Sequence, residues 1–219
     1  GVDPKACDLD GNVVVSELGE IVIASPMPSM PVGFWGDDEG RRFRATYFEE
    51  FPEVFRFGDW CRFSTVGSCL ITGRSDATLN RGGVRLGTAE FYRVLQDVPE
   101  VTDSVVVHLE DPEGGLGQLL LFVVLAPGQV LDDALTRLLT GRIRRTLSPR
   151  HLPDRIVAVP SVPYSRTGKK LEVPIKQILR GAPPDQAASP GALLDPSALD
   201  AYAAFAASAD GPARPGGPA

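Results

Sequence analysis

The sequence predicts an α+β protein with a small β-rich subdomain, a compact α+β domain containing a three-stranded sheet with helices, and an Ala/Pro/Gly-rich tail. Three observations support this prediction. Short apolar runs broken by turn residues fill the first 70 positions. From about residue 86, segments with helical periodicity alternate with apolar strands. From Pro183 onward, 23 of the 37 residues are Ala, Pro or Gly. We therefore expect domains at 1–75, 76–182 and 183–219.

The first 70 residues read as strands joined by turns. The pair Asp10-Gly11 is typical of a hairpin turn between two short apolar runs. The aromatic stretch Phe43–Phe57 is expected to be irregular. Strands are predicted at residues 5–7, 13–15, 20–24, 61–63 and 69–71.

The pattern from residue 86 onward predicts a leading helix followed by β-β-α-β. Asp132 is expected to cap a helix that runs to about Leu147, because its carboxylate can accept a free amide at the helix start. Strands are predicted at 101–109, 119–125 and 155–159, and short helices from about 86 and at 175–179. In the tail, one helix is expected at 197–207, and the last ten residues are expected to be disordered.

Composition excludes several classes of partner. The net charge is −6 with no long basic run, so nucleic acid is not an expected partner. No apolar stretch approaches the roughly 18 residues of a membrane span. Three cysteines without metal-type spacing predict free thiols in a reducing, cytoplasmic compartment and no metal site. His108 lies in an apolar run and is expected to be a packed side chain. Because the chain begins with Gly, we expect a fragment or a processed product.

A glycine-rich stretch within Thr72–Tyr92 is the first candidate site. Gly82 and Gly83 would let a ligand approach the backbone closely, because they carry no Cβ atom. Arg81 and Arg85 flank them and could hold a phosphate as planar donors. The residues alone leave two interpretations open: an anion-binding loop or an ordinary turn.

Two further stretches carry groups suited to chemistry. Lys169 follows Gly168 on a loop and would present an ammonium group to a phosphate or carboxylate oxygen; a solvated basic turn is the alternative. Asp59 follows a glycine at an expected strand start and could accept hydrogen bonds from two vicinal hydroxyls; an ordinary turn aspartate is the alternative.

These stretches resemble the acyl-adenylate-forming enzymes, which include the acyl-CoA synthetases, the adenylation domains of peptide synthetases and the luciferases. Gly73–Asp76 and Gly83–Glu90 resemble the hinge motif of the family, and Pro163–Lys169 resembles its lysine motif. Within the family, the sequence is most similar to the branch that activates acetoacetate. Two departures, Gly67-Ser68 and Phe91, touch no proposed site residue.

The resemblance implies a role for each matching residue. Lys169 would be the catalytic lysine that reaches the acyl carboxylate and the α-phosphate of ATP. Asp59 would bind the ribose, with Arg74 near the same nucleotide and Arg85 near the phosphate. Asp76 would be the hinge about which a mobile C-terminal domain, carrying Lys169, rotates between half-reactions.

Further roles follow from the same resemblance. Gly82 and Gly83 would line the tunnel for the pantetheine arm of CoA, and Arg144 would contact CoA, with an exposed helix charge as the alternative. A lysine acetyltransferase and deacetylase acting at Lys169 are possible partners, because acetylation would remove the charge that the reaction needs.

The activity implied is that of an acid–thiol ligase joining acetoacetate to CoA through an acyl-adenylate, with ATP, Mg²⁺ and CoA as ligands. The phosphate loop and acyl pocket of such enzymes would lie upstream in a missing N-terminal domain, so the isolated chain is expected to be inactive. Two alternatives remain: a synthetase for another short-chain acid such as acetate, or a non-catalytic truncated module.

Overall fold

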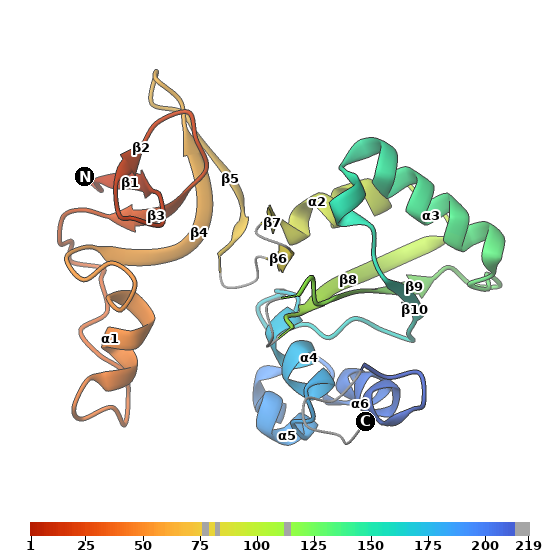
Figure 1. Cartoon of the computed structure of the whole chain (residues 1–219). Helices are drawn as coiled ribbons and strands as arrows, with labels where there is room; N and C mark the ends of the chain where they lie inside the picture. Colours follow the sequence, from red (N-terminus) through yellow and green to blue (C-terminus); the bar gives the residue numbers. More distant parts are fainter. Residues whose placement is uncertain (76–78, 82–83, 112–114, 213–219) are drawn as a thin grey trace. The chain divides into compact units, whose positions relative to one another are not determined.

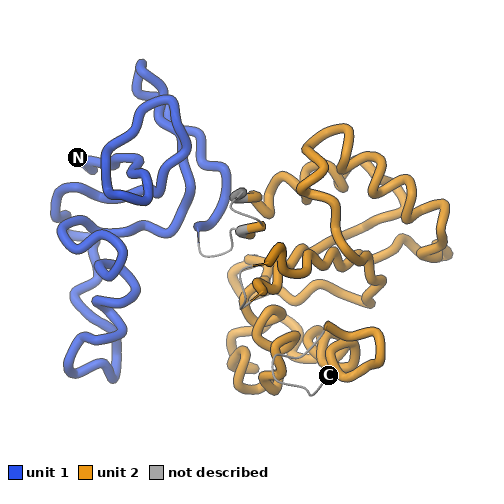
Figure 2. Tube along the Cα trace, in the orientation of Figure 1, with its two compact units in different colours: residues 1–78 blue, residues 79–219 orange. Residues whose placement is uncertain are grey.

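The computed structural model describes residues 1–75, 79–81, 84–111 and 115–212. The chain divides into two compact units, residues 1–78 and 79–219 (Figure 2). The three-part division predicted at residues 75 and 182 stays a prediction.

Unit 1 contains an antiparallel sheet in the order β2-β1-β3-β4-β5 (Figure 1). The hairpin predicted at Asp10-Gly11 is confirmed, because β1 and β2 pair across this turn with Ala6 opposite Val14. The strands are β1 Pro4–Cys7, β2 Val13–Val14, β3 Gly19–Ile23, β4 Phe55–Phe63 and β5 Cys69–Arg74.

The prediction that Phe43–Phe57 is irregular was wrong, because helix α1 spans Arg41–Tyr47 and β4 begins at Phe55. The amides of Arg42 and Phe43 donate to the Asp37 carboxylate, which therefore satisfies the start of the helix from outside it. The ring of Tyr47 stacks on Phe55 at 4.3 Å between centroids. The helix has no buried stripe, and this absence of a core-facing apolar pattern explains why the sequence did not reveal it.

Unit 2 is built on the predicted three-stranded sheet, with the order β10-β9-β8 (Figure 1). Strands β8 (Val101–Leu109) and β9 (Gln118–Leu125) are antiparallel, whereas β10 (Arg155–Ala158) runs parallel to β9. Alternate residues of β9 enter two different cores: Leu121 packs on one face and Phe122 on the other. Burial on both faces explains the nearly continuous apolar runs of these strands.

Helices cover both faces of this sheet. Residues of α2 (Thr88–Leu95) and α3 (Asp133–Thr146) pack in one core, and those of α4 (Glu172–Leu179) and α6 (Asp200–Ala207) in the other. The smaller elements are β6 Leu79–Arg81, β7 Val84–Leu86, α5 Pro184–Ala187 and three 3-10 turns, η1 Pro149–His151, η2 Pro190–Ala192 and η3 Pro196–Leu199. Among the helices that the structure describes, none has the length and apolar character needed to cross a membrane.

The tail beyond Pro183 contributes to the core of unit 2. Leu193, Leu199 and Tyr202 are buried among the residues on the α4 face of the sheet. The Tyr202 ring lies 4.9 Å from that of Phe122, and its hydroxyl donates to the Ser161 carbonyl at 3.1 Å. The helix predicted at 197–207 is present as α6 from Asp200 onward, whereas its first three residues lie in the 3-10 turn η3. The rings of Tyr202 and Phe205 both pack against Phe122 of the sheet.

The predicted cap at Asp132 is confirmed, and it gives a stability test. The Leu135 amide donates to Asp132 Oδ1 at 2.8 Å. Asp132→Ala is expected to lower the free energy of unfolding by about 1 kcal/mol, because it leaves a helix amide without this partner. The matched control is Asp133→Ala, which removes the next carboxylate and should cost about 0.5 kcal/mol or less through the helix dipole alone. Equal losses in urea unfolding would contradict the capping role.

Candidate active site

Two of the predicted nucleotide-binding residues, Asp59 and Arg74, are cross-strand partners in unit 1. The Arg74 Nε atom lies 3.9 Å from Asp59 Oδ1, and 50% of the arginine side chain is exposed against 16% of the aspartate. A carboxylate that accepts hydrogen bonds thus lies beside a guanidinium that donates them. This arrangement suits a ligand with both hydroxyl and anionic groups.

Asp59 lies within β4, not at a strand start as the sequence predicted. The strand is irregular here, because its register with β3 shifts between Glu20 and Val22. Gly58 has a φ of 88°, and a Cβ atom on it would lie 3.2 Å from Arg74 Nη2. Glycine at this position therefore allows the left-handed backbone conformation and lets the Arg74 side chain lie close to the backbone.

A buried carboxylate that the sequence analysis missed, Glu20, lies beneath these residues. Only 1% of Glu20 is exposed. Its Oε1 atom accepts from the Gly58 amide and from the Ser75 hydroxyl, both at 2.9 Å, and Arg56 Nε lies 3.5 Å away. The Ser75 amide in turn donates to the Gly58 carbonyl at 3.0 Å. Glu20 thus links Gly58, which precedes Asp59, to Ser75, which follows Arg74. A glutamate at the start of an otherwise apolar strand was the available signal.

Burial raises the pKa of Glu20 above the usual value for a glutamate. The hydroxyl of Ser75, the positive charge of Arg56 and the Gly58 amide oppose this effect, but they do not cancel it. The folded protein therefore favours the protonated carboxyl more than the unfolded chain does.

Residues 163–170 of unit 2 form a tight turn that we call the lysine hairpin. Tyr164 and Lys170 face each other as an antiparallel bridge at its base. The Ser165 amide donates to the Lys169 carbonyl at 2.8 Å, and the Lys169 amide donates to Ser165 Oγ at 3.1 Å. Gly168 has a φ of 78°, which allows the chain to reverse direction. The predicted loop is therefore an ordered hairpin.

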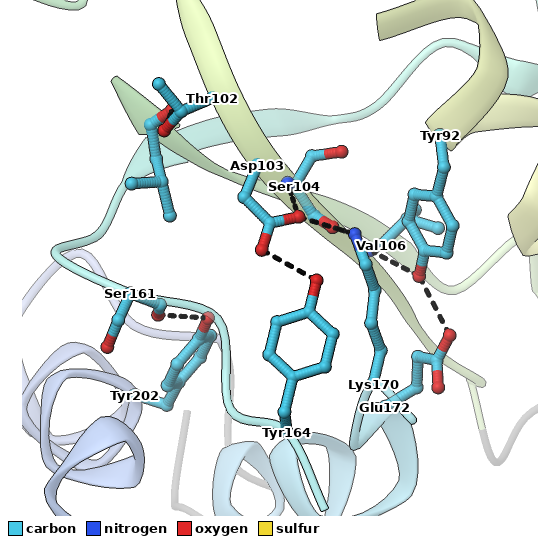
Figure 3. A network of polar contacts seen from close by, with 11 residues as sticks. Tyr92, Thr102, Asp103, Ser104, Val106, Ser161, Tyr164, Lys170, Glu172 and Tyr202 are labelled. Carbon is cyan, nitrogen blue, oxygen red and sulfur yellow. Dashed lines mark hydrogen bonds and ion pairs between the residues drawn. The ribbon is translucent and has the colours of Figure 1, made fainter. Parts of the chain in front are cut away.

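The two adjacent lysines of this hairpin have different environments. Lys170 extends inward: its Nζ atom lies 2.6 Å from Asp103 Oδ1 and 4.1 Å from the centre of the Tyr92 ring, and it donates to the Ser104 carbonyl (Figure 3). Lys169 is exposed. Among the residues that the structure describes, none accepts a hydrogen bond from the Lys169 ammonium group or forms an ion pair with it. Of the pair, Lys169 is the lysine available to a ligand.

Two tyrosines complete the environment of Lys170 (Figure 3). The Tyr164 hydroxyl donates to Asp103 Oδ2 at 2.8 Å, and the Tyr92 hydroxyl donates to Glu172 Oε1 at 2.9 Å. Burial, and then the neighbouring carboxylate in each case, raises the pKa of both phenols. Both hydroxyls therefore remain protonated donors at neutral pH, which keeps the network in one charge state.

The remaining predicted residues are only partly described. Arg144 is exposed on α3, where it is accessible to a ligand. Arg85 lies in β7 with its backbone opposite Asn80, but its side chain is outside the description. The calls at Asp76, Gly82 and Gly83 also lie outside the described residues.

Arg81 serves the fold rather than a free anion site. Its Nη2 atom lies 2.6 Å from Asp154 Oδ1, and its Nη1 atom donates to the Leu152 carbonyl at 2.5 Å. His108 is buried in β8, as predicted, with Nε2 2.8 Å from the Leu116 carbonyl oxygen.

No group of three or more His, Cys, Asp or Glu side chains that could hold a metal ion occurs among the residues described. Cys7 and Cys61 are buried free thiols, and Cys69 is an exposed one.

Comparison with known proteins gives one match to a family model. Residues 93–169, from α2 to Lys169, match the family model of the AMP-binding enzyme C-terminal domain. This segment of the chain therefore matches the domain that the sequence resemblance implied.

Three similar proteins share one name, acetoacetyl-CoA synthetase. The chain is 39% identical over 208 residues to an acetoacetyl-CoA synthetase of Caenorhabditis elegans, covering 94% of this chain and 29% of that protein. It is 42% identical over 194 residues to that of Rhizobium meliloti, covering 89% and 29%. The solved acetoacetyl-CoA synthetase of Streptomyces lividans matches with a TM-score of 0.85 and 42% identity, covering 94% and 30%. The chain thus spans about 30% of the length of these relatives.

The raised pKa of Glu20 predicts a pH-dependent stability. Because the folded-state pKa lies above the unfolded one, the folded protein binds more protons, and the contribution of Glu20 to stability falls as pH rises through the interval between them. In urea unfolding, Glu20→Gln should therefore become progressively more favourable relative to the parent as pH rises from about 4 to about 7.

The exposed Glu17 gives the matched control for that experiment. Glu17→Gln removes the same charge from unit 1 without altering the contacts of Gly58 and Ser75. A difference between Glu20→Gln and the parent that stays constant with pH, or that changes in the opposite direction, would contradict the assignment.

Proposed function

We propose that this chain supplies the C-terminal region of an acid–thiol ligase that converts acetoacetate, ATP and CoA into acetoacetyl-CoA, AMP and pyrophosphate through an acetoacetyl-adenylate. The observation that carries the proposal is Lys169: it lies free on an ordered hairpin, at the end of the segment that matches the AMP-binding C-terminal domain. The names of the relatives support acetoacetate as the acid.

The proposed role of Lys169 is electrostatic. As an acyl carboxylate attacks the α-phosphate of ATP, negative charge develops on the phosphate oxygens, and a free ammonium group stabilises that charge. Lys169 meets the requirement because its three donors are not engaged by the described residues, whereas those of Lys170 are.

In the same proposal, Asp59 accepts hydrogen bonds from the ribose hydroxyls, and Arg74 lies beside the nucleotide. Their cross-strand pairing supports joint action on one ligand. Arg85 would lie near the phosphate. Rotation at Asp76 would follow adenylation, after which Gly82 and Gly83 would line the pantetheine tunnel and Arg144 would contact CoA.

We propose further that the full reaction needs a partner domain outside this chain for the ATP and acyl pockets, so that the chain alone is inactive. Magnesium would then enter bound to ATP, since the described residues offer it no ligand cluster. A cytoplasmic location is supported by the three free cysteines. The exposure of Lys169 would make it accessible to a modifying acetyltransferase.

The test joins this chain to the N-terminal region of the Streptomyces lividans relative and follows AMP release with ATP, acetoacetate and CoA. The parent fusion should turn over, and Lys169→Ala should lower adenylate formation by about 10²-fold or more, because one charge that stabilises the transition state is lost. The variant should still convert supplied acetoacetyl-adenylate and CoA to the thioester.

The matched control is Arg137→Ala, which removes one exposed positive charge from α3 on the other face of the sheet. It should leave adenylation unchanged. Full adenylation by a folded Lys169→Ala fusion would contradict the role of Lys169. A fusion that turns over acetate or propionate but not acetoacetate would contradict the substrate.

A further inference from the structure

One carboxylate, that of Asp103, holds both strands of the lysine hairpin (Figure 3). Its Oδ2 atom accepts from the Tyr164 hydroxyl at 2.8 Å, and its Oδ1 atom lies 2.6 Å from Lys170 Nζ. Tyr164 precedes the turn, Lys170 follows it, and the two form its base. Asp103 lies more than 60 residues earlier in the chain, in β8.

We propose that Asp103 is a positioning residue for Lys169: through Tyr164 and Lys170 it fixes the base of the lysine hairpin and thereby the place from which the Lys169 ammonium acts. This inference rests on the proposed function, because it describes how the lysine of that reaction is presented. Asp103 itself touches no reacting atom in this account.

Asp103 is suited to this role because it is fixed in turn. It lies beside an irregularity in the pairing of β8 with β9, at the register shift between Val101 and Asp103. Its Oδ1 atom also accepts from the amide of the next residue, Ser104, at 2.7 Å. The side chain is 25% exposed and that of Lys170 is 20% exposed, so the ion pair is largely shielded from water.

Hydrogen bonds and one peptide bond connect Asp103 to Lys169 through Tyr164 and Ser165. Tyr164 is followed by Ser165, which exchanges hydrogen bonds with Lys169 through its amide and its Oγ atom. On the outer side, the Leu194 amide donates to the Tyr164 carbonyl at 2.9 Å, and Ser165 forms a bridge with Leu193. The backbone of Lys169 is thus held while its side chain stays free to reach a ligand.

The first experiment measures hydrogen exchange of the backbone amides in this chain. In Asp103→Asn and in Lys170→Met, the amides of Ser165, Gly168 and Lys169 should exchange about tenfold faster than in the parent, because the base of the hairpin opens more often. Amides of β9 should be unaffected. Tyr164→Phe removes one donor only and gives a milder variant in case the charge change prevents folding. Unchanged exchange in a folded Asp103→Asn and in Tyr164→Phe would overturn the proposal.

The second experiment uses the joined enzyme and separates the half-reactions. Asp103→Asn should lower the rate of adenylate formation about tenfold or more while conversion of supplied acetoacetyl-adenylate stays within about twofold, a split that general loss of folded protein would not produce. Lys170→Met should show the same split. Thr102→Ala, in the neighbouring position of β8, is the control and should show neither loss.

The outcomes distinguish this inference from the proposed function. If Lys169→Ala abolishes adenylation but Asp103→Asn, with its hairpin loosened, adenylates at the parent rate, the positioning role is wrong and the proposed function stands. If Lys169→Ala adenylates normally, the proposed role of Lys169 fails, and the positioning role fails with it. An equal loss in both half-reactions for Asp103→Asn would also overturn the positioning role.

Discussion

The ion pair between Asp103 and Lys170 joins the base of the lysine hairpin to the sheet of unit 2. The lysine ammonium reaches a carboxylate, a backbone carbonyl and the face of the Tyr92 ring, so the charge is partly buried with partners on several sides. A partly buried charge is tolerated in a protein only when it is paired in this way. The Lys170 side chain points toward Asp103, whereas that of its neighbour Lys169 lies exposed at the surface, where it can bind an anionic ligand.

The end of strand β8 also contacts helix α4, which follows the lysine hairpin in the chain. Glu110, just beyond its end, accepts hydrogen bonds from Lys176 of α4 and from Arg180, which follows that helix. Burial would raise the pKa of Glu110, but the Lys176 hydrogen bond and both positive charges outweigh it and lower the pKa. The end of this strand thus contacts both the hairpin and the helix after it, and the strand itself is paired with β9 and packed in a core on each face. A rigid support of this kind suits a charge that must be placed accurately.

The sequence predicted the elements whose signals are local. Apolar runs located the strands of unit 2, and Asp132 located the start of α3. Helix α1 was missed because Asp37, whose carboxylate accepts from its first amides, precedes it by several residues and because it has no buried stripe. The candidate lysine was found from its motif, but the pairing that distinguishes it from Lys170 was not, because that partner is 67 residues away. Glu20 was missed for the same reason, since it joins residues 38 and 55 positions later.

In the folded chain Lys169 is exposed whereas Lys170 is held by its partners, and this difference is measurable. Amine labelling of the folded chain, located by tandem mass spectrometry, tests it directly without any assumption about substrate. An excess of a small acylating reagent should modify Lys169 at least about tenfold faster than Lys170, because the partners of Lys170 must first release it, and the difference should disappear in denaturant. Equal labelling of the two lysines in the folded chain, or faster labelling of Lys170, would show that Lys170 is not held by these partners.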